Sequence, residues 1–212
     1  MTEQPAPEGT VFIVDDDPSI RRALSRLFAS IGLVSETYEG GDDFLKRAPR
    51  QGRGCILLDI KMPGLTGLEL QRRLLADGIE LPVIFVTAHA DVPLAVRAIK
   101  DGAVEVFTKP FDDQKLIEAV HLAMARDRAN HQLRLEYGEL KTRYGALTDR
   151  QRTVMDLVVI GHANKEIAET LGTSLKTVKV HRGQVMRKMG AASLAELVRK
   201  SVRLAGSHRS HE

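Results

Sequence analysis

The chain has 212 residues, of which 43% are hydrophobic and 28% charged, and its formal net charge at neutral pH is +3. This length suffices for two small domains, and no apolar run approaches the roughly 18 residues that a membrane-spanning helix requires. The single cysteine, Cys55, excludes an internal disulfide and favours a cytoplasmic protein. Residues 1–9 lack the basic and apolar segments of a secretory signal, so they are predicted to be a disordered tail.

Charge is divided unequally along the chain. Residues 1–125 hold 14 Lys and Arg against 19 Asp and Glu, whereas residues 126–212 hold 17 against 9. An acidic first part suits a site for a divalent cation, and a basic second part suits a polyanion such as nucleic acid. A basic surface is also compatible with simple solvation, so charge alone does not assign a partner.

Four short apolar runs in the acidic part each lead into a polar residue. The runs are residues 11–14, 55–58, 83–86 and 104–108, and the polar residues are Asp15 with Asp16, Asp59, Thr87 and Lys109. Short apolar runs separated by amphipathic stretches predict a parallel sheet with crossover helices. Because ligands bind at the carboxyl ends of the strands in such sheets, we expect these polar side chains to form one site.

The three carboxylates of this site indicate a bound cation, because Asp15, Asp16 and Asp59 cannot all stay ionised at close range without one. Mg²⁺ fits, since it accepts oxygen ligands and retains waters. Lys109 is then interpreted as the counterion of a more anionic group, most simply a phosphoryl group. Two local alternatives remain: an Asp after a strand is often a turn residue, and the acidic run can begin a helix. The second applies to Asp17, which precedes Pro18 as a helix N-cap and is left out of the site.

The motifs VDDD, LDIKMPG, VTAHAD and FTKPF occur in the order and spacing of the receiver domain of two-component response regulators. Residues 10–126 therefore resemble that domain. The resemblance implies an α/β fold with a doubly wound, flavodoxin-like, five-stranded parallel sheet, and a phosphoryl group transferred to Asp59 from a histidine kinase. It also implies metal ligands at Asp15, Asp16, Asp59 and the Lys61 backbone carbonyl, phosphoryl contacts from Thr87 and Lys109, and a cis Lys109–Pro110 peptide.

Further residues near this site are predicted to control the phosphorylated state. Thr87 and Phe107 are expected to form a switch between two pre-existing packings. Lys61 and His89 each lie two positions after a site residue, where receiver domains admit attacking water. They either influence the lifetime of the phosphoryl group or are solvated loop residues.

Residues 127–146 are predicted to be a helical linker that continues the last receiver helix, which begins at Asp113. The segment has no Pro and is rich in Arg, Glu, Leu and Lys, with a heptad-like seam of Leu133, Tyr137, Leu140, Tyr144 and Leu147. The seam is too short to hold a dimer alone, and Gly138 and Gly145 weaken it. The helix either couples the domains, pairs with a partner subunit or lies singly on the receiver.

Residues 165–171 and 175–189 predict two helices joined by a turn, which is a helix-turn-helix pattern. On the second helix Val178, Val185, Met189 and either His181 or Arg182 recur at helical spacing and should face inward. The opposite stripe presents cations to phosphates or guanine and a Val methyl group to thymine. That stripe carries Lys176, Lys179, Val180, Gly183, Gln184 and Arg187.

Residues 147–207 also resemble the LuxR-type DNA-binding domain of the FixJ/NarL family. Matching motifs include NKEIA, TVKVH and KMG, and a closing helix is expected at about residues 193–204, where the family often forms a dimer contact. By resemblance, Lys179, Val180 and Gly183 occupy the base-reading positions of the second helix. The full predicted set of DNA-binding residues is Lys165, Lys176, Thr177, Lys179, Val180, His181, Gly183, Gln184 and Arg187.

Two residues depart from expectation in this second domain. Gln151 stands where the family usually has Glu, which puts an internal ion pair in doubt. Gly183 lies in mid-helix, which costs about 1 kcal/mol relative to Ala. It either lets the helix approach the groove closely or is merely tolerated.

The expected function is that of a non-enzymatic, phosphorylation-switched transcription regulator, similar to the FixJ/StyR-like subgroup and acting as an activator. The expected partners are a histidine kinase, double-stranded promoter DNA, RNA polymerase and, after phosphorylation, a second copy of the chain, with no membrane. A phospho-aspartate phosphatase is an alternative, although that class usually has a second Asp where this chain has Lys61. A receiver acting through protein or RNA contacts is the other, and the helix containing residues 177–181 argues against it.

The receiver face expected to form the homodimer combines residues 92–101, the strand that ends at Lys109 and the helix from Asp113. This face mixes apolar and charged side chains, which suits a reversible interface. Its apolar members are Leu94, Val96, Ile99 and Ile117.

Overall fold

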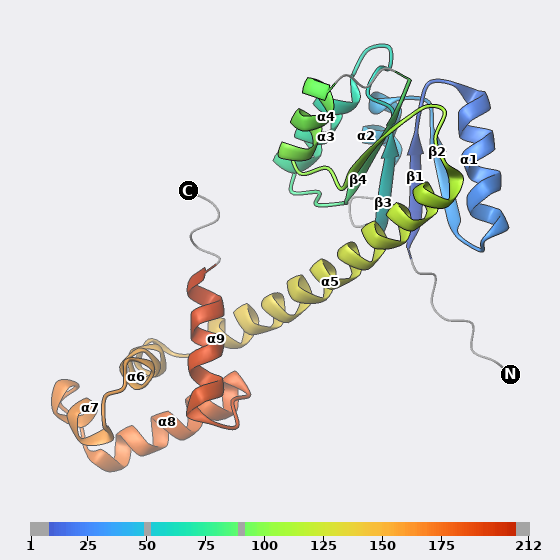
Figure 1. Cartoon of the computed structure of the whole chain (residues 1–212). Helices are drawn as coiled ribbons and strands as arrows, with labels where there is room; N and C mark the ends of the chain where they lie inside the picture. Colours follow the sequence, from blue (N-terminus) through green and yellow to red (C-terminus); the bar gives the residue numbers. More distant parts are fainter. Residues whose placement is uncertain (1–8, 49–51, 89–91, 207–212) are drawn as a thin grey trace, which may run out of the picture. The chain divides into compact units, whose positions relative to one another are not determined.

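The computed structural model describes residues 9–48, 52–88 and 92–206, and the chain divides into two compact units between His131 and Gln132. The first unit contains a five-stranded parallel sheet of order β2-β1-β3-β4-β5 (Figure 1). Its strands are β1 (Thr10–Val14), β2 (Val34–Tyr38), β3 (Gly54–Leu58), β4 (Val83–Thr87) and β5 (Glu105–Thr108). This order is that of the flavodoxin-like doubly wound fold, as the resemblance to receiver domains implied.

Two layers of helices cover the sheet. Their bounds are α1 (Pro18–Ser30), α2 (Gly41–Arg47), α3 (Gly67–Ala76), α4 (Val92–Lys100) and α5 (Asp113–Gly145). Successive strand residues face opposite sides, so Val11 and Ile13 pack with α1 and α5, while Phe12 and Val14 pack with α2, α3 and α4. Because β1, β3 and β4 are covered on both faces, each is a continuous apolar run.

The edge strand β2 is the one strand whose position the apolar runs did not indicate. Its sequence, Val-Ser-Glu-Thr-Tyr, alternates between exposed and less exposed positions, and only Tyr38 is fully buried. It pairs in parallel with β1, Val34 beside Thr10 and Tyr38 beside Val14. An edge position leaves part of a strand in water, which weakens the hydrophobic signal in the sequence.

The second unit is helical. It contains α6 (Asp149–Ile160), α7 (Asn164–Thr170), α8 (Leu175–Met189) and α9 (Leu194–Gly206), and it begins within α5. Its core includes Val154, Val158 and Ile167 together with the predicted inward residues of α8. Those inward residues are Val178, Val185 and Met189, with exposures of 0 to 1%.

The last turns of α5 belong to this second core. Leu140 and Leu147 are buried there and Tyr144 packs against them, whereas Leu133 is 52% exposed. Three of the five residues of the predicted heptad seam therefore pack inside the helical unit. The sequence left open whether this helix lies on the receiver, and these buried contacts show that its end packs with the helix-turn-helix instead.

Helix ends follow the residues that the sequence offers for capping. The Asp17 side chain accepts a hydrogen bond from the Ser19 amide at 2.7 Å and starts α1. Ser174 caps the start of α8, and Gly190, in the left-handed conformation, caps its end after Met189. The expected positions of α8 and the cis Lys109–Pro110 peptide are confirmed.

Two of the predictions concern residues that the structure does not describe. Residues 1–8 of the predicted tail, and His89, lie outside the described residues. Cys55 is fully buried in the core of the first unit. None of the described helices is long and apolar enough to span a membrane.

Candidate functional site

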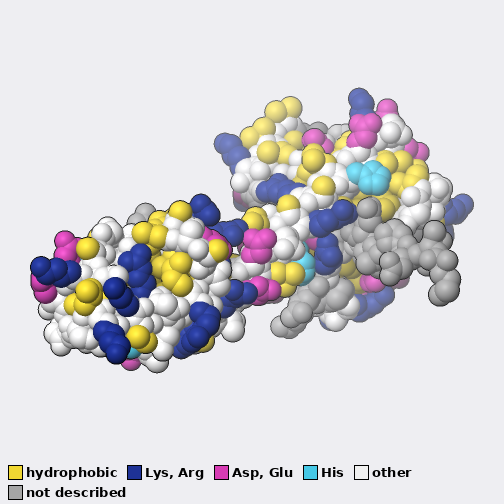
Figure 2. All heavy atoms as spheres, turned by 90° about the horizontal axis from the view of Figure 1, so that it is seen from below, with side chains coloured by type: hydrophobic (Ala, Val, Ile, Leu, Met, Phe, Trp, Pro, Cys, Tyr) yellow, Lys and Arg dark blue, Asp and Glu magenta, His cyan; other side chains and the backbone are white. Residues whose placement is uncertain are grey.

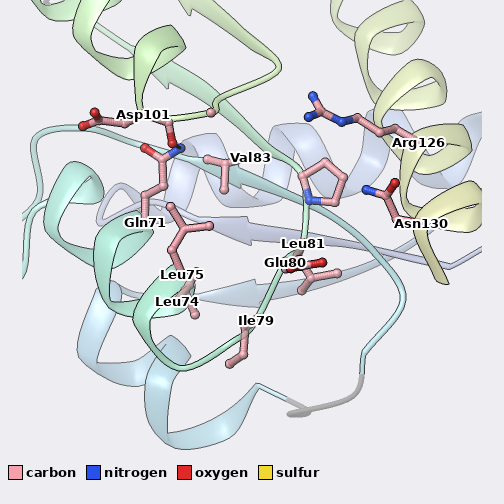
Figure 3. Close-up of a pocket in the computed structure, with 12 residues that line it drawn as sticks. Gln71, Leu74, Leu75, Ile79, Glu80, Leu81, Val83, Asp101, Arg126 and Asn130 are labelled. Carbon is pink, nitrogen blue, oxygen red and sulfur yellow. Dashed lines mark hydrogen bonds between the residues drawn. The ribbon is translucent and has the colours of Figure 1, made fainter. Parts of the chain in front are cut away.

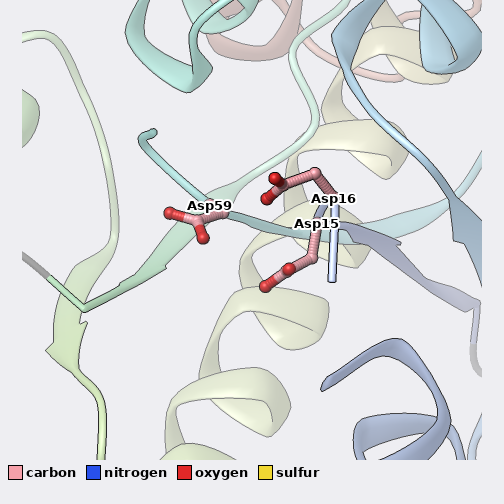
Figure 4. Close-up of side chains that lie close together, drawn as sticks. All are labelled: Asp15, Asp16 and Asp59. Atoms are coloured by element: carbon pink, nitrogen blue, oxygen red, sulfur yellow. The ribbon is translucent and has the colours of Figure 1, made fainter. Parts of the chain in front are cut away.

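The carboxyl ends of β1 and β3 bring two of the predicted acidic residues together. Val14 pairs with Leu58, and the Asp59 amide donates to the Val14 carbonyl at 2.9 Å, so Asp15 and Asp59 follow neighbouring strand ends. Together with Asp16 they form a cluster in which one carboxylate oxygen from each lies within 4.8 Å of the others (Figure 4). Asp15 and Asp59 are buried, whereas Asp16 is exposed.

Lys109 joins this cluster from the end of β5. Its Nζ lies 2.6 Å from Asp15 Oδ2 and 3.0 Å from Asp59 Oδ2, so one ammonium bridges both buried carboxylates. The Lys109 backbone amide donates to the Thr87 carbonyl at 2.9 Å, which ties the site to β4. Residues that are 94 positions apart in the chain are thus in direct contact.

The single ammonium of Lys109 does not balance the charge of three carboxylates. Burial raises the pKa of Asp15, although hydrogen bonds from Lys109 and the Asp17 amide oppose that effect. For Lys109, burial disfavours the charged form, but the hydrogen bonds to Asp15 and Asp59 outweigh it and raise the pKa. Asp15 thus carries an unfavourable charge that a further cation would stabilise.

The donor set suits a divalent cation. Three carboxylates offer hard oxygen ligands, and the exposed Asp16 keeps one side of the cluster open to water. Such a site can bind a divalent metal ion that retains part of its hydration.

Backbone amides orient the two buried carboxylates. The Asp17 amide donates to Asp15 Oδ1 at 2.9 Å, and the Lys61 amide donates to Asp59 Oδ1 at 3.1 Å. Each carboxylate therefore turns its other oxygen toward Lys109. Lys61 itself is exposed.

Gly67 is a positioning residue that the sequence analysis did not identify. A Cβ at this position would lie 2.2 Å from the Asp59 carbonyl oxygen, so only glycine lets the start of α3 approach Asp59 this closely. Its amide also donates to the Ile60 carbonyl at 3.0 Å. The available signal was a second glycine three residues after the LDIKMPG motif.

The predicted switch residues lie on adjacent strands. Thr87 is fully buried at the end of β4, and Val86 pairs with Phe107 of β5. Phe107 is partly exposed and packs against the layer formed by α1 and α5. The two residues are close enough in the sheet to influence one another.

A surface cavity of about 240 Å³ lies at the other end of β4 (Figure 3). Its lining is mixed: apolar side chains around Val83 lie beside the polar or charged residues Gln71, Glu80, Asp101, Arg126 and Asn130. Gln71 donates to the Asp101 carbonyl at 3.1 Å. The acidic cluster contributes nothing to this cavity.

The predicted outward stripe of α8 is exposed in part. Lys176, Lys179, Gly183 and Arg187 are exposed, Val180 is 52% exposed, and Lys165 is exposed on α7. Figure 2 shows Lys and Arg side chains spread over the second unit, at the left of the view. Exposed cations on one helix can reach phosphates without losing internal partners.

Three residues of the predicted DNA-binding set are less accessible. Thr177, His181 and Gln184 are partly buried. The Thr177 amide donates to Ser174 Oγ, the N-cap of α8, at 3.0 Å. His181 Nδ1 is buried and finds no hydrogen-bond partner in the described part of the chain.

The comparisons with known proteins agree with this geometry. Residues 11–121 match the family described as response regulator receiver domain, and residues 145–201 match the bacterial regulatory proteins of the luxR family. The chain is a response regulator of the FixJ/NarL family. This response regulator is 43% identical to Nodulation protein W of Bradyrhizobium diazoefficiens over 90% of its own length and 84% of that protein.

Two further relatives cover nearly the whole chain. The response regulator is 43% identical to the transcriptional regulatory protein FixJ of Azorhizobium caulinodans, over 92% of each chain. The solved structure of the response regulator StyR is 40% identical, with a TM-score of 0.83 over 92% of this chain and 98% of that one.

The two matched families define the function of this response regulator. It is a transcriptional regulator in which the receiver implies a kinase partner and the LuxR-type domain implies DNA binding. The phosphatase and protein-contact alternatives are not favoured, because both domains match over their expected segments.

Proposed function

We propose that this response regulator is phosphorylated on Asp59 by a histidine kinase. The observation that best supports this proposal is the position of the Lys109 ammonium, which bridges the buried Asp15 and Asp59 carboxylates. In the transfer, the N–P bond of the kinase phosphohistidine breaks, and an O–P bond to the Asp59 carboxylate forms. Lys109 would then pair with the phosphoryl oxygens, because it already lies 3.0 Å from Asp59.

Mg²⁺ is the proposed cofactor of this transfer. Asp15, Asp16, Asp59 and the Lys61 backbone carbonyl would hold it, and the carboxylate cluster supports that assignment. When bound, Mg²⁺ neutralises charge on the transferring group. Lys61 is exposed beside Asp59, so its side chain can affect water access and thereby the phosphoryl lifetime.

We propose that Thr87 and Phe107 transmit the phosphorylation of Asp59 from the site to the surface of the receiver. The Thr87 hydroxyl would bond a phosphoryl oxygen, and Phe107 would move into the space so opened. Their positions on paired strands support this coupling. It biases two packings of one structure rather than creating a new one.

Phosphorylation is proposed to promote a homodimer through α4, β5 and the start of α5. Val96 and Ile99 are 47% and 45% exposed on α4, and Leu94 and Ile117 are partly buried nearby. Lys100, Lys115 and Glu118 place charges on the same helices, and Asp101 directly follows α4. Exposed apolar side chains that are flanked by charged side chains suit reversible association.

The dimer would present two DNA-binding domains to two half-sites in promoter DNA. We propose domain boundaries at residues 10–126 for the receiver, 127–146 for the helical linker and 147–207 for the DNA-binding domain. We further propose that the DNA-bound dimer activates RNA polymerase at the promoter. The protein would act in the cytoplasm.

One experiment tests the whole sequence of events. Genomic fragments bound by the full chain are selected with and without a small phosphodonor in Mg²⁺, and sedimentation is measured on the same samples. The proposal expects one enriched palindromic sequence and a dimer only after phosphorylation. A phosphorylated protein that stays monomeric and binds its operator as one copy would overturn the dimer. Absence of any enriched sequence would overturn promoter recognition.

A further inference from the structure

A buried amide network connects the start of α6 with the recognition helix α8. Gln151 is only 5% exposed. Its Oε1 accepts hydrogen bonds from the Thr148 amide at 3.1 Å and from Lys188 Nζ at 2.8 Å. Its Nε2 donates to Gln184 Oε1 at 2.8 Å. Gln184 lies on the stripe of α8 proposed to face DNA.

Chemistry decides the orientation of both amides in this network. The Thr148 amide and the Lys188 ammonium are donors only, so they require the Gln151 oxygen. The NH₂ group of Gln151 must then face Gln184. Because that group is also only a donor, Gln184 has to turn its own oxygen inward. Lys188 cannot leave freely, since it also donates to the Ala146 carbonyl at 2.8 Å.

We propose that Gln151 is a specificity-determining positioning residue that makes Gln184 present a hydrogen-bond donor to DNA. Gln151 is too buried to touch the nucleic acid itself. With its oxygen turned inward, Gln184 offers its NH₂ group outward, which can bond phosphate, guanine O6 or N7, or thymine O4. An outward oxygen would instead accept from cytosine N4 or adenine N6. The inference rests on the proposed promoter binding and on the predicted DNA contacts of the α8 stripe.

Gln151→Glu reverses this arrangement with little change in side-chain size. A carboxylate still accepts from the Thr148 amide and from Lys188, with which it gains an ion pair. It cannot donate to Gln184, so Gln184 would turn its NH₂ group inward and its oxygen outward. The substitution therefore preserves the fold while it changes what α8 presents.

The test is a double-mutant cycle on the phosphorylated full chain. Wild type, Gln151→Glu, Gln184→Ala and the double variant are compared on the selected operator and on duplexes with single base changes. We expect Gln151→Glu to weaken operator binding about tenfold, within the range of one side-chain contact to DNA, and to change base preference at one position per half-site. In the Gln184→Ala background the same substitution should have a much smaller effect, which measures only the added negative charge.

Two further measurements separate this role from a structural one. Thermal unfolding of Gln151→Glu should occur at the wild-type temperature or above it, because the Lys188 contact gains charge. Side-chain amide exchange by NMR should show a protected Gln151 NH₂ and a fast-exchanging Gln184 NH₂ in wild type. If Gln151→Glu does not fold, this exchange measurement on wild type still decides the orientation.

The opposing outcomes are distinct. Equal losses in both backgrounds, unchanged operator preference in Gln151→Glu, or a protected Gln184 NH₂ in wild type would each overturn the inference. A wild-type protein that binds operator and random duplex equally would overturn the proposed function as well.

Discussion

The acidic cluster of the receiver and the outward stripe of α8 use charge in opposite ways. Asp15, Asp59 and Lys109 are largely buried and come from three strand ends, and the single ammonium partly neutralises the two carboxylates. Lys179 and Arg187 are exposed on a single helix and have no such neighbour in the described contacts. Buried charges need internal partners, so the first region is organised before its ligand binds, whereas the second, in the proposed function, would obtain its partners from DNA.

The largest expected effect is the loss of phosphorylation when Asp59, at the centre of the acidic cluster, is replaced. Asp59→Asn should abolish labelling by a phosphodonor in Mg²⁺, because an amide oxygen does not replace the carboxylate nucleophile. Asp77→Asn, on an exposed carboxylate at the end of α3, serves as the matched control and should label normally. Labelling of Asp59→Asn at the wild-type level would place the phosphoacceptor elsewhere.

Thr87→Ala should separate phosphorylation from its output. The variant retains Asp59 and Lys109 and should be labelled, but it should lose the rise in DNA affinity that phosphorylation produces. Thr87→Ser keeps the hydroxyl and should restore that rise. Fluorescence anisotropy with operator DNA measures both variants, and a normal rise in Thr87→Ala would exclude this coupling route.

Lys179→Ala probes the second region. The loss of one exposed cation should weaken operator binding by about 1–3 kcal/mol if Lys179 contacts a base. Lys141→Ala, an exposed lysine on α5, is the control. A loss that is equal on operator and random duplex would reassign Lys179 to a phosphate, and no loss on either would mean that the stripe does not face DNA.

Mg²⁺ should stabilise the receiver by about 2.7 kcal/mol at a hundredfold excess over its dissociation constant. Asp16→Asn removes one ligand and should weaken this stabilisation, while Asp77→Asn should not. Burial raises the pKa of Asp15, and protons compete with the metal. The Mg²⁺ effect should therefore shrink as pH falls toward that raised pKa. Thermal unfolding with Mg²⁺ or a chelator measures it, and an effect that is equal in Asp16→Asn would argue against this ligand.

The smallest effect concerns Gly183. An added Cβ would meet nothing within 4 Å, so Gly183→Ala should stabilise the protein by about 1 kcal/mol. Gly138→Ala, also open on its helix, is the control for stability alone. If Gly183→Ala keeps full operator affinity, the glycine is merely tolerated. Weaker binding would show that the helix needs it to approach the groove.

Periodicity and strand-end residues were enough to predict much of this protein. The parallel sheet, the bounds of α8 and its inward residues followed from local patterns, because each pattern reflects how one element is buried, on both faces for a central strand and on one face for a helix. The motifs around Asp15, Asp59, Thr87 and Lys109 also placed these residues at strand ends that meet in the sheet.

Tertiary structure alone decided the contacts between distant segments. The 2.6 Å contact of Lys109 with Asp15, the close approach of Gly67 to Asp59, and the burial of Leu140 in the helical unit each depend on packing that no local pattern encodes. The same holds for Gln151, which local sequence marks only as a departure from its family. Its amide acquires a direction solely because the fold places Thr148, Lys188 and Gln184 around it.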